Sequence, residues 1–291
     1  MLTTNRTCCL GVPVNGRLKS LLVACGCVLC ALILSGCSGE RVKEKTVYVH
    51  LKDVPSSDWD RLSRKKVYFG HQSVGYDLLE GVRDVMRDNP QIKLNIVESR
   101  EALPQRQGAL VHSKIGRNAD PKSKMDDFSQ MMEKGSGMDS DIAVLKLCFV
   151  DILPNTDPAK VMEDYESTVT MLKKRHPRTT FVHVTVPLTA KQSWLKEVIK
   201  DLVGKMNFYD NVKRNVYNDL LRQKYGGTEP FFDLAALEST FPDGSRSSFT
   251  KEGRTYYSLV PAYTHDGGHL NETGRRLVAE QLLVYLARLS Q

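Results

Sequence analysis

The sequence predicts an α/β fold in which helices cover both faces of a parallel sheet. From about residue 61 to the C-terminus, short runs of β-branched or aromatic residues alternate with amphipathic helical patterns. The run Ile142–Phe149 is almost continuously apolar, which is typical of a central strand buried on both faces. The helical pattern after it begins with a cap residue followed by Pro158, and proline is favoured at the first helical position. These three observations favour repeated strand–helix units in one domain.

The expected elements follow one another along the chain. Five strands are expected at Val67–Phe69, Ile92–Val97, Ile142–Phe149, Thr180–Val186 and Phe231–Leu234. Helices are expected at about Tyr76–Arg87, Lys122–Lys134, Pro158–Arg175, Ser193–Met206, Asn211–Tyr225 and Glu272–Leu289. The sequence has no internal repeat and no low-complexity segment, so residues 61–291 are predicted to form a single domain.

The first 36 residues are predicted to be a secretory signal. Their three basic residues come without any acidic residue, and the apolar run Leu21–Leu34 follows. This run is shorter than the roughly 20 residues that span a bilayer. The closing Leu34-Ser35-Gly36-Cys37 resembles the lipobox of bacterial lipoproteins, which implies that Cys37 becomes the lipidated first residue of the mature chain. An ordinary signal with an incidental cysteine is the alternative.

Removal of the predicted signal and lipidation of Cys37 would determine which cysteines and what net charge the mature chain keeps. Five of the seven cysteines lie in the signal and Cys37 would carry lipid, so only Cys148 remains and no intramolecular disulfide can form. Residues 37–60 are polar and are predicted to be a tether and lead-in segment. Removal of the three basic signal residues lowers the formal net charge from +7 to +4. The remaining basic residues are scattered among acidic ones, which does not favour a nucleic-acid partner.

A serine lies at the turn between the first strand and the first helix of the predicted domain. The stretch reads VYFGHQSVGYDLLEGV over residues 67–82, with Ser73 flanked by two glycines. In open parallel sheets, ligands bind outside the carboxyl ends of the strands. A helix N-terminus there favours negative charge, which suits a nucleophile whose attack creates an oxyanion. The match to the G-x-S-x-G elbow is partial, and a helix-cap role for Ser73 is the alternative.

A base and an acid for this serine lie just before the last predicted helix. Asp266 and His269 are three residues apart, with two glycines between them. On a tight turn this spacing lets the carboxylate accept a hydrogen bond from one imidazole nitrogen and leaves the other facing outward. An Asx-turn and a helix-start residue are the alternative roles. Taken with Ser73, the pattern favours a serine nucleophile, a histidine base and an aspartate that orients it.

These residues resemble the motifs of the SGNH (GDSL-type) hydrolases over residues 64–291, and the ending DGGHLNETG is the most specific match. The resemblance implies a three-layer α/β/α sandwich with a five-stranded parallel sheet of flavodoxin-like topology. It also implies a triad of Ser73, Asp266 and His269 and a carboxylic ester hydrolase that needs no cofactor. The family includes esterases, lipases, carbohydrate O-acetyl esterases and acyltransferases.

Two departures from the family pattern concern the oxyanion hole. Gln72 precedes the serine where the family has Asp, and Val150 stands where the family has an oxyanion-hole Asn. Gly116 matches the glycine of the second family block. The amides of Gly116 and Ser73 are therefore expected to bind the oxyanion, with the Asn118 side chain in place of the missing Asn. Three further residues are candidates to line the substrate site: His71, Gln72 and Arg117. Packing within its own turn is the alternative for His71, and a core or surface role is the alternative for Arg117.

The remaining polar residues give weaker indications of a catalytic or metal-binding role. His71, His265, Asp266 and His269 lack the spacing of known zinc motifs, so no metal site is predicted. His183 lies in an apolar strand and is predicted to be structural. Lys146 also lies in an apolar strand, where an unpaired charge is costly, so either a carboxylate partner or emergence near the strand end is expected.

The sequence thus favours an exported serine esterase, anchored to the membrane by lipid on Cys37. Its location in the cell envelope favours an O-acylated or O-acetylated polysaccharide as the substrate. Ser38 after the cysteine favours the periplasmic face of the outer membrane. The alternative is a non-catalytic envelope protein that uses the same cleft to bind glycan or a partner protein, which the departures at Gln72 and Val150 favour.

Overall fold

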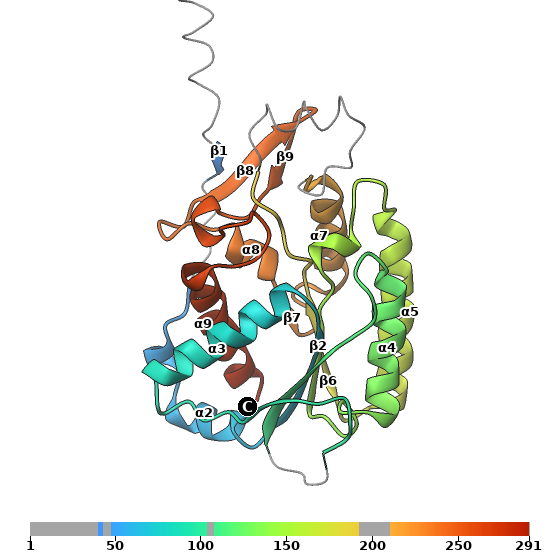
Figure 1. The fold of residues 1–291 in the computed structure, drawn as a ribbon, viewed down its shortest axis with the longest axis vertical. Coiled ribbons are helices and arrows are strands. Elements are labelled where there is room, and N and C mark those ends of the chain that lie inside the picture. Colours follow the sequence, from blue (N-terminus) through green and yellow to red (C-terminus); the bar gives the residue numbers. More distant parts are fainter. Residues whose placement is uncertain (1–39, 43–47, 104–107, 192–209, 291) are drawn as a thin grey trace, which may run out of the picture. The chain divides into compact units, whose positions relative to one another are not determined.

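A computed structural model describes residues 40–42, 48–103, 108–191 and 210–290 (Figure 1). The predicted signal, Cys37 and the helix expected at Ser193–Met206 lie outside the described residues. Within these ranges, no helix is both long and apolar enough to cross a membrane.

The centre of the fold is a parallel sheet of six strands in the order β3-β4-β2-β5-β6-β7. The strands are β2 (Lys66–His71), β3 (Ile96–Glu98), β4 (Ala109–Lys114), β5 (Ile142–Leu145), β6 (Thr180–Val184) and β7 (Phe231–Phe232). Without β3, the order of the other five is that of the flavodoxin-like doubly wound sheet, and β3 adds an outer edge beside β4. In this order, β2 lies between β4 and β5, so the turn that holds Ser73 follows a central strand.

The expected number of five strands was wrong because β4 was missed. Its sequence, ALVHSK, places His112 and Ser113 where an apolar run would continue. Both side chains are nevertheless buried. The Tyr68 hydroxyl and Ser113 Oγ are 2.8 Å apart, and His71 Nε2 and His112 Nδ1 are 3.1 Å apart. Buried polar groups that hydrogen-bond to one another can occupy a central strand, and the apolar pattern gives no sign of them.

Helices cover both faces of the sheet, which confirms the three-layer arrangement (Figure 1). The helices are α2 (Ser56–Leu62), α3 (Val74–Asp88), α4 (Pro121–Lys134), α5 (Pro158–Arg175), α7 (Val212–Tyr225), α8 (Leu234–Glu238) and α9 (Glu272–Leu289). Strand β2 shows how alternate residues divide the core: Val67 and Phe69 face α3 and α9, whereas Tyr68 faces α4 and α5.

The helices expected at Pro158–Arg175 and Glu272–Leu289 have the predicted bounds. Asp157 caps α5 by accepting hydrogen bonds from Ala159 N and Lys160 N, and Pro158 is its first residue. Three short 3₁₀ helices lie in the loops: η1 (Leu51–Asp53), η2 (Phe149–Asp151) and η3 (Pro261–Tyr263). The strand expected at Ile142–Phe149 ends at Leu145, and η2 begins four residues later.

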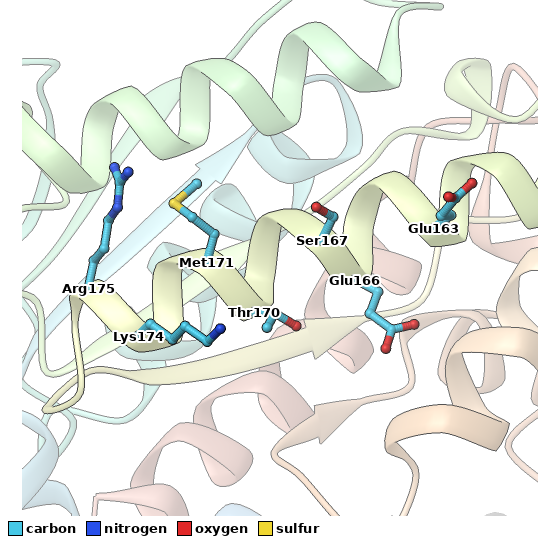
Figure 2. Close-up of a pocket in the computed structure, with 7 residues that line it drawn as sticks. All are labelled: Glu163, Glu166, Ser167, Thr170, Met171, Lys174 and Arg175. Carbon is cyan, nitrogen blue, oxygen red and sulfur yellow. The ribbon is translucent and has the colours of Figure 1, made fainter.

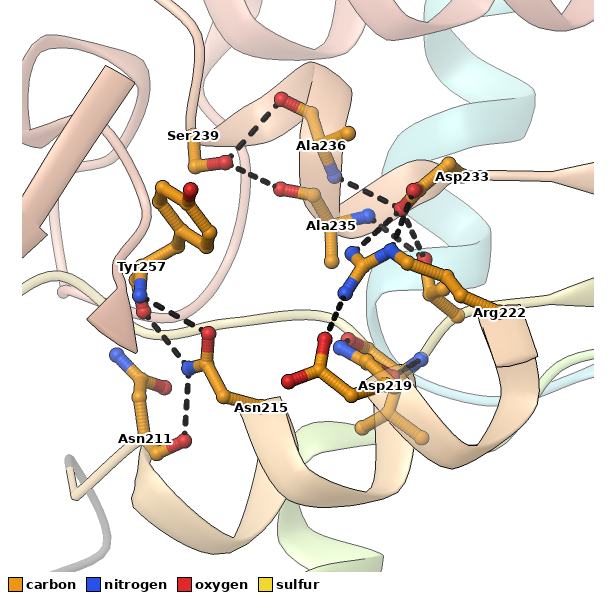
Figure 3. Close-up of polar contacts among 12 residues, drawn as sticks. Asn211, Asn215, Asp219, Arg222, Asp233, Ala235, Ala236, Ser239 and Tyr257 are labelled. Carbon is orange, nitrogen blue, oxygen red and sulfur yellow. Dashed lines mark hydrogen bonds and ion pairs between the residues drawn. The ribbon is translucent and has the colours of Figure 1, made fainter. Parts of the chain in front are cut away.

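A second, antiparallel sheet was not expected from the sequence. It consists of β1 (Glu40–Val42), β8 (Arg246–Lys251) and β9 (Arg254–Tyr257) in the order β1-β8-β9. Polar contacts attach this sheet to α7 (Figure 3). Asn215 Nδ2 donates to Tyr257 O at 3.0 Å, and Tyr257 N donates to Asn215 Oδ1 at 2.9 Å. Farther along α7, Arg222 binds Asp233 through two nitrogens at 2.7 and 2.9 Å, which fixes the start of α8.

A buried carboxyl group at the end of α8 makes stability depend on pH. Glu238 accepts a hydrogen bond from Leu188 N, while its Oε2 is buried without a partner in the described structure. Burial raises the pKa of Glu238 from 4.5 to about 8. Between these values the folded state keeps the proton and the unfolded state releases it. Stability should therefore fall as pH rises across this range, by at most about 1.4 kcal/mol per pH unit.

The Glu238→Gln variant cannot ionise, so we expect its stability relative to the wild type to improve as pH rises. Urea unfolding at about pH 5 and about pH 8 measures the two free energies of unfolding. A difference between variant and wild type that stays constant between these pH values would contradict the buried neutral carboxyl.

Candidate active site

Ser73 lies in a strained turn between β2 and α3. Its φ is 53° and its ψ is −118°, a conformation that non-glycine residues rarely adopt. Ser73 occupies the N-cap position of α3, but its side chain makes no capping hydrogen bond. Residue 75, two positions later, has to be glycine because a Cβ at Gly75 would lie only 2.3 Å from the ring of His71. The turn therefore presents the serine hydroxyl instead of using it to cap the helix.

The structure brings Ser73, His269 and Asp266 together. Ser73 Oγ lies 2.7 Å from His269 Nε2, and His269 Nδ1 lies 2.6 Å from Asp266 Oδ2. The serine and the histidine are 196 positions apart in the sequence. The side chains of His269 and Asp266 are 46% and 56% exposed, so the row of three residues lies at an open surface.

The loop that carries Asp266 keeps its carboxylate ionised. Partial burial acts to raise the pKa of Asp266, but hydrogen bonds from Gly268 N and from the His269 side chain and backbone outweigh it and hold the pKa well below its ordinary value. Oδ1 accepts from Gly268 N and His269 N, both at 2.8 Å. An ionised Asp266 accepts the proton of Nδ1, which leaves Nε2 able to accept the proton of Ser73.

Residues that the sequence did not single out hold this loop beside α3. Asp77, in the first turn of α3, accepts a hydrogen bond from Leu270 N at 3.0 Å. The ring of Phe149 meets the ring of His269 edge to face, with centroids 5.8 Å apart. A Cβ at Gly268 would lie 2.9 Å from Phe149, so this glycine allows the close approach. The helix dipole favours an acidic residue such as Asp77 in the first turn of α3, but the sequence pattern does not indicate its partner.

His71 was expected to line the substrate site, and this expectation was wrong. The residue is completely buried beneath the turn and faces His112. Burial, with Lys146 and His112 nearby, holds the pKa of His71 far below its ordinary value, so the ring is neutral. A side chain with no exposed surface cannot contact a substrate, so His71 supports the turn by packing.

Gln72 and Arg117, the other two expected lining residues, are both engaged by neighbouring groups. Gln72 Nε2 donates to the backbone oxygens of Ile115 and Gly116 at 2.8 and 2.5 Å, which ties the serine turn to the loop after β4. Arg117 pairs with Asp120 at 2.7 Å, and its side chain is 79% exposed. Gln72 thus links the serine turn to the loop after β4, and Arg117 is a surface residue of that loop.

The expected oxyanion hole is incomplete. Gly116 N donates to Asp127 Oδ2 at 2.8 Å, so this amide is not available to a substrate. The side-chain oxygen of Asn118 accepts from Lys124 Nζ at 3.0 Å, which leaves the Nδ2 group as the side-chain donor. Val150, in η2, carries no polar group. The backbone N–H of Ser73, at the N-terminus of α3, and the side-chain nitrogen of Asn118 remain as the expected donors.

A buried ion pair next to the serine turn connects the start of α4 to the segment after β5. Lys124 Nζ lies 2.6 Å from Asp151 Oδ2, and both side chains are 0% exposed. Asp151 also accepts from Ala119 N at 3.0 Å and from Cys148 N at 2.6 Å. The Asp151 carboxylate therefore connects the loop after β4, the start of α4 and the segment after β5.

The remaining polar residues have structural partners or lie in solvent. His183 is buried, with Tyr165 at 2.8 Å from one ring nitrogen and Glu229 at 2.9 Å from the other. This geometry agrees with the structural role predicted for His183. His265 is exposed, and Cys148 is buried and is not part of a disulfide. Within the described ranges, no group of three or more His, Cys, Asp or Glu residues could hold a metal ion.

A surface hollow lies elsewhere, along α5 (Figure 2). Its volume is about 580 Å³ and its lining is mostly charged and polar: Glu163, Glu166, Ser167, Thr170, Met171, Lys174 and Arg175. None of these residues belongs to the Ser73 site. Since the lining side chains share one exposed helix face and show no convergent catalytic set, the hollow does not compete with Ser73 as a candidate active site.

No protein-family model and no curated protein sequence matches this chain. Among solved structures, a candidate acylhydrolase of Bacteroides fragilis aligns with 85% of this chain and all of its own length, at 15% identity and a TM-score of 0.47. The lipase/acylhydrolase of Enterococcus faecalis aligns with 77% of this chain and 96% of its own length, at 11% identity and a TM-score of 0.44. A carbohydrate esterase family 3 protein of Talaromyces cellulolyticus covers the same shares, at 12% identity and a TM-score of 0.42.

Proposed function

We propose that this chain is a serine ester hydrolase of the SGNH (GDSL) type. One observation carries the proposal: the continuous row Ser73 Oγ, His269 Nε2, His269 Nδ1 and Asp266 Oδ2, with separations of 2.7 and 2.6 Å at its two hydrogen bonds. The strained backbone of Ser73, whose hydroxyl does not cap α3, supports a nucleophile at this position.

The geometry supports acyl transfer in two steps. Ser73 Oγ attacks the ester carbonyl while its proton passes to His269 Nε2, and the carbonyl oxygen becomes an oxyanion beside the N-terminus of α3. The oxyanion collapses, the bond to the alcohol breaks, and His269 gives its proton to the departing alkoxide. Water then attacks the acyl–Ser73 ester by the same route. Asp266 holds the tautomer of His269 and stabilises the imidazolium.

The openness of the site favours an acyl group on a large carrier. With His269 and Asp266 about half exposed, an ester on a bulky carbohydrate can approach without entering a deep pocket. We therefore propose O-acyl or O-acetyl esters of an envelope or extracellular polysaccharide as the substrate class. Transfer to another alcohol in place of water would use the same acyl–Ser73 intermediate.

The envelope location is a separate proposal, supported by the N-terminal pattern that ends in Leu34-Ser35-Gly36-Cys37. Lipid on Cys37 would anchor the protein, and more than one acyl chain would make the anchoring stable. We expect the full chain to sediment with membranes and the Cys37→Ser variant to lose the lipid. Metabolic labelling with an alkynyl fatty acid measures this. Equal labelling of variant and wild type would contradict lipidation at Cys37.

The test of the activity uses the mature chain from Ser38 onward, which lacks the predicted anchor. We expect it to hydrolyse p-nitrophenyl acetate and to release acetate from an O-acetylated polysaccharide. The competing function is glycan binding without catalysis, favoured by the engaged Gly116 amide and by Val150. A folded protein that binds the polysaccharide without turnover of either ester would support binding and reject the hydrolase.

A further inference from the structure

Lys146 is a buried cation directly behind the serine turn. It follows the last residue of β5, and its side chain has no exposed surface. The sequence left a carboxylate partner or emergence into solvent as its two alternatives, and the structure shows neither. Lys146 Nζ donates to Gln72 O and Leu147 O, both at 3.2 Å, and lies 3.5 Å from Cys148 Sγ. No ion pair of Lys146 is found in the described part of the chain.

The hydrogen-bonding partners of Lys146 do not neutralise its buried charge. Moving an ammonium group out of water costs several kcal/mol, which a close carboxylate can offset. The neighbouring buried lysine, Lys124, has such a carboxylate in Asp151. Lys146 has only neutral groups within hydrogen-bonding distance. A methionine of similar volume could fill the same space without the cost of burying a charge. A lysine at this position points to a function for its charge.

The carbonyl that Lys146 contacts belongs to the same peptide unit as the Ser73 amide. Gln72 C=O and Ser73 N–H are the two ends of one planar, conjugated group. Gln72 O also accepts from Gly75 N at 3.0 Å and lies 3.3 Å from Cys148 Sγ. A cation at the oxygen end draws electron density from the amide, so the N–H at the other end becomes a stronger hydrogen-bond donor.

The site needs a strong donor at this position. Gly116 N–H is bound to Asp127, and Val150 supplies no side-chain donor. With the Gly116 N–H engaged, the Ser73 N–H, at the positive end of the α3 dipole, stabilises a larger share of the oxyanion charge than it would in a complete oxyanion hole. The hydrogen bond from Lys146 would also fix the orientation of the peptide, which the strained φ of Ser73 makes costly to hold.

We propose that Lys146 is a positioning residue that holds the Gln72–Ser73 peptide and strengthens the Ser73 N–H as the oxyanion donor. This inference rests on the proposed function, because it assigns a residue to the same reaction. Lys146 acts through the peptide group and does not touch the substrate.

The test compares Lys146→Met, which removes charge and donors, with Lys146→Gln, which keeps a neutral donor. We expect Lys146→Met to lower kcat for p-nitrophenyl acetate on the order of tenfold with KM unchanged, less than the roughly 10²–10³ lost with a whole oxyanion donor. Lys146→Gln should lose less. An aryl trifluoromethyl ketone, whose adduct with Ser73 carries an oxyanion, should bind more weakly by the factor by which kcat/KM falls.

Val169→Ala, in the α5 side of the core, is the matched control for lost stability. It should lower the melting temperature and leave kcat and ketone affinity of the folded protein unchanged. Should Lys146→Met fail to fold, Lys146→Gln and Cys148→Ala, which alters the same carbonyl, carry the test.

Two results would contradict the role of Lys146, and both can be distinguished from a failure of the proposed function. Folded Lys146 variants that keep wild-type kcat and ketone affinity, or that change KM alone, overturn the role of Lys146 and leave the esterase standing. A wild type without turnover and without labelling of Ser73 overturns the esterase, and this inference with it.

Discussion

Ser73→Ala is expected to reduce ester turnover by at least about 10³-fold, because it removes the oxygen that forms the acyl intermediate. His269→Ala should cost a similar factor, since the base lies 2.7 Å from Ser73 Oγ and no second base is placed to replace it among the described residues. Losses in residues that act as one unit are not additive, so the double variant should be little slower than either single variant. Steady-state rates with p-nitrophenyl acetate give all three values.

The control for these variants is Ser129→Ala on α4. The Ser129 hydroxyl donates only to Met125 O within its own helix, at 2.9 Å. This variant should keep wild-type turnover, and all variants should keep the wild-type circular dichroism spectrum. A Ser73→Ala protein with more than about a tenth of wild-type turnover would be incompatible with Ser73 as the nucleophile.

Lys124→Met is expected to have the largest effect on stability. It leaves the Asp151 carboxylate in a site without solvent, opposite an apolar side chain, and breaking a buried ion pair in this way costs about 3–5 kcal/mol. The Asp151 oxygens would still accept from Ala119 N and Cys148 N, so part of the charge stays solvated by the backbone. Urea unfolding measures the loss, and turnover should fall as well because Asp151 connects the loops beside the serine turn.

Lys122→Met provides the matched comparison on the same helix. Lys122 pairs with Asp126, but both side chains are more than half exposed, at 57% and 60%. Exposed pairs contribute about 0–1 kcal/mol, so this variant should unfold almost as the wild type does. Equal losses in the two variants would mean that Lys124 contributes by helix propensity or packing and not by neutralising Asp151.

Much of the architecture could be predicted from residue patterns. The period of apolar residues and the cap before Pro158 gave the bounds of α5, and the same period gave those of α9. Ser73, Asp266 and His269 could be proposed from local motifs, because each lies in a short turn whose glycines allow conformations and close contacts that other residues do not. That they lie close together was expected from the rule that sites form at the carboxyl ends of parallel strands and from the resemblance to the SGNH motifs.

The features that were missed depend on contacts between distant segments. Strand β4 contains two polar residues whose partners lie on β2, 45 and 41 positions away. The amide of Gly116 was expected to face a substrate, but a carboxylate 11 residues later binds it. Lys146 was expected to find a carboxylate or water, and its closest polar partners are backbone oxygens and a thiol. Local patterns report which face of an element is apolar, but not which polar group meets another.

Covalent labelling of the wild-type protein with a fluorophosphonate probe tests the central claim most directly. The probe needs an activated serine but no knowledge of the natural ester. Peptide mass spectrometry should locate one adduct on Ser73, and His269→Ala should slow its formation severely while Ser129→Ala leaves it unchanged. A folded protein that stays unlabelled, or that is labelled elsewhere at the same rate in His269→Ala, would contradict a nucleophilic Ser73.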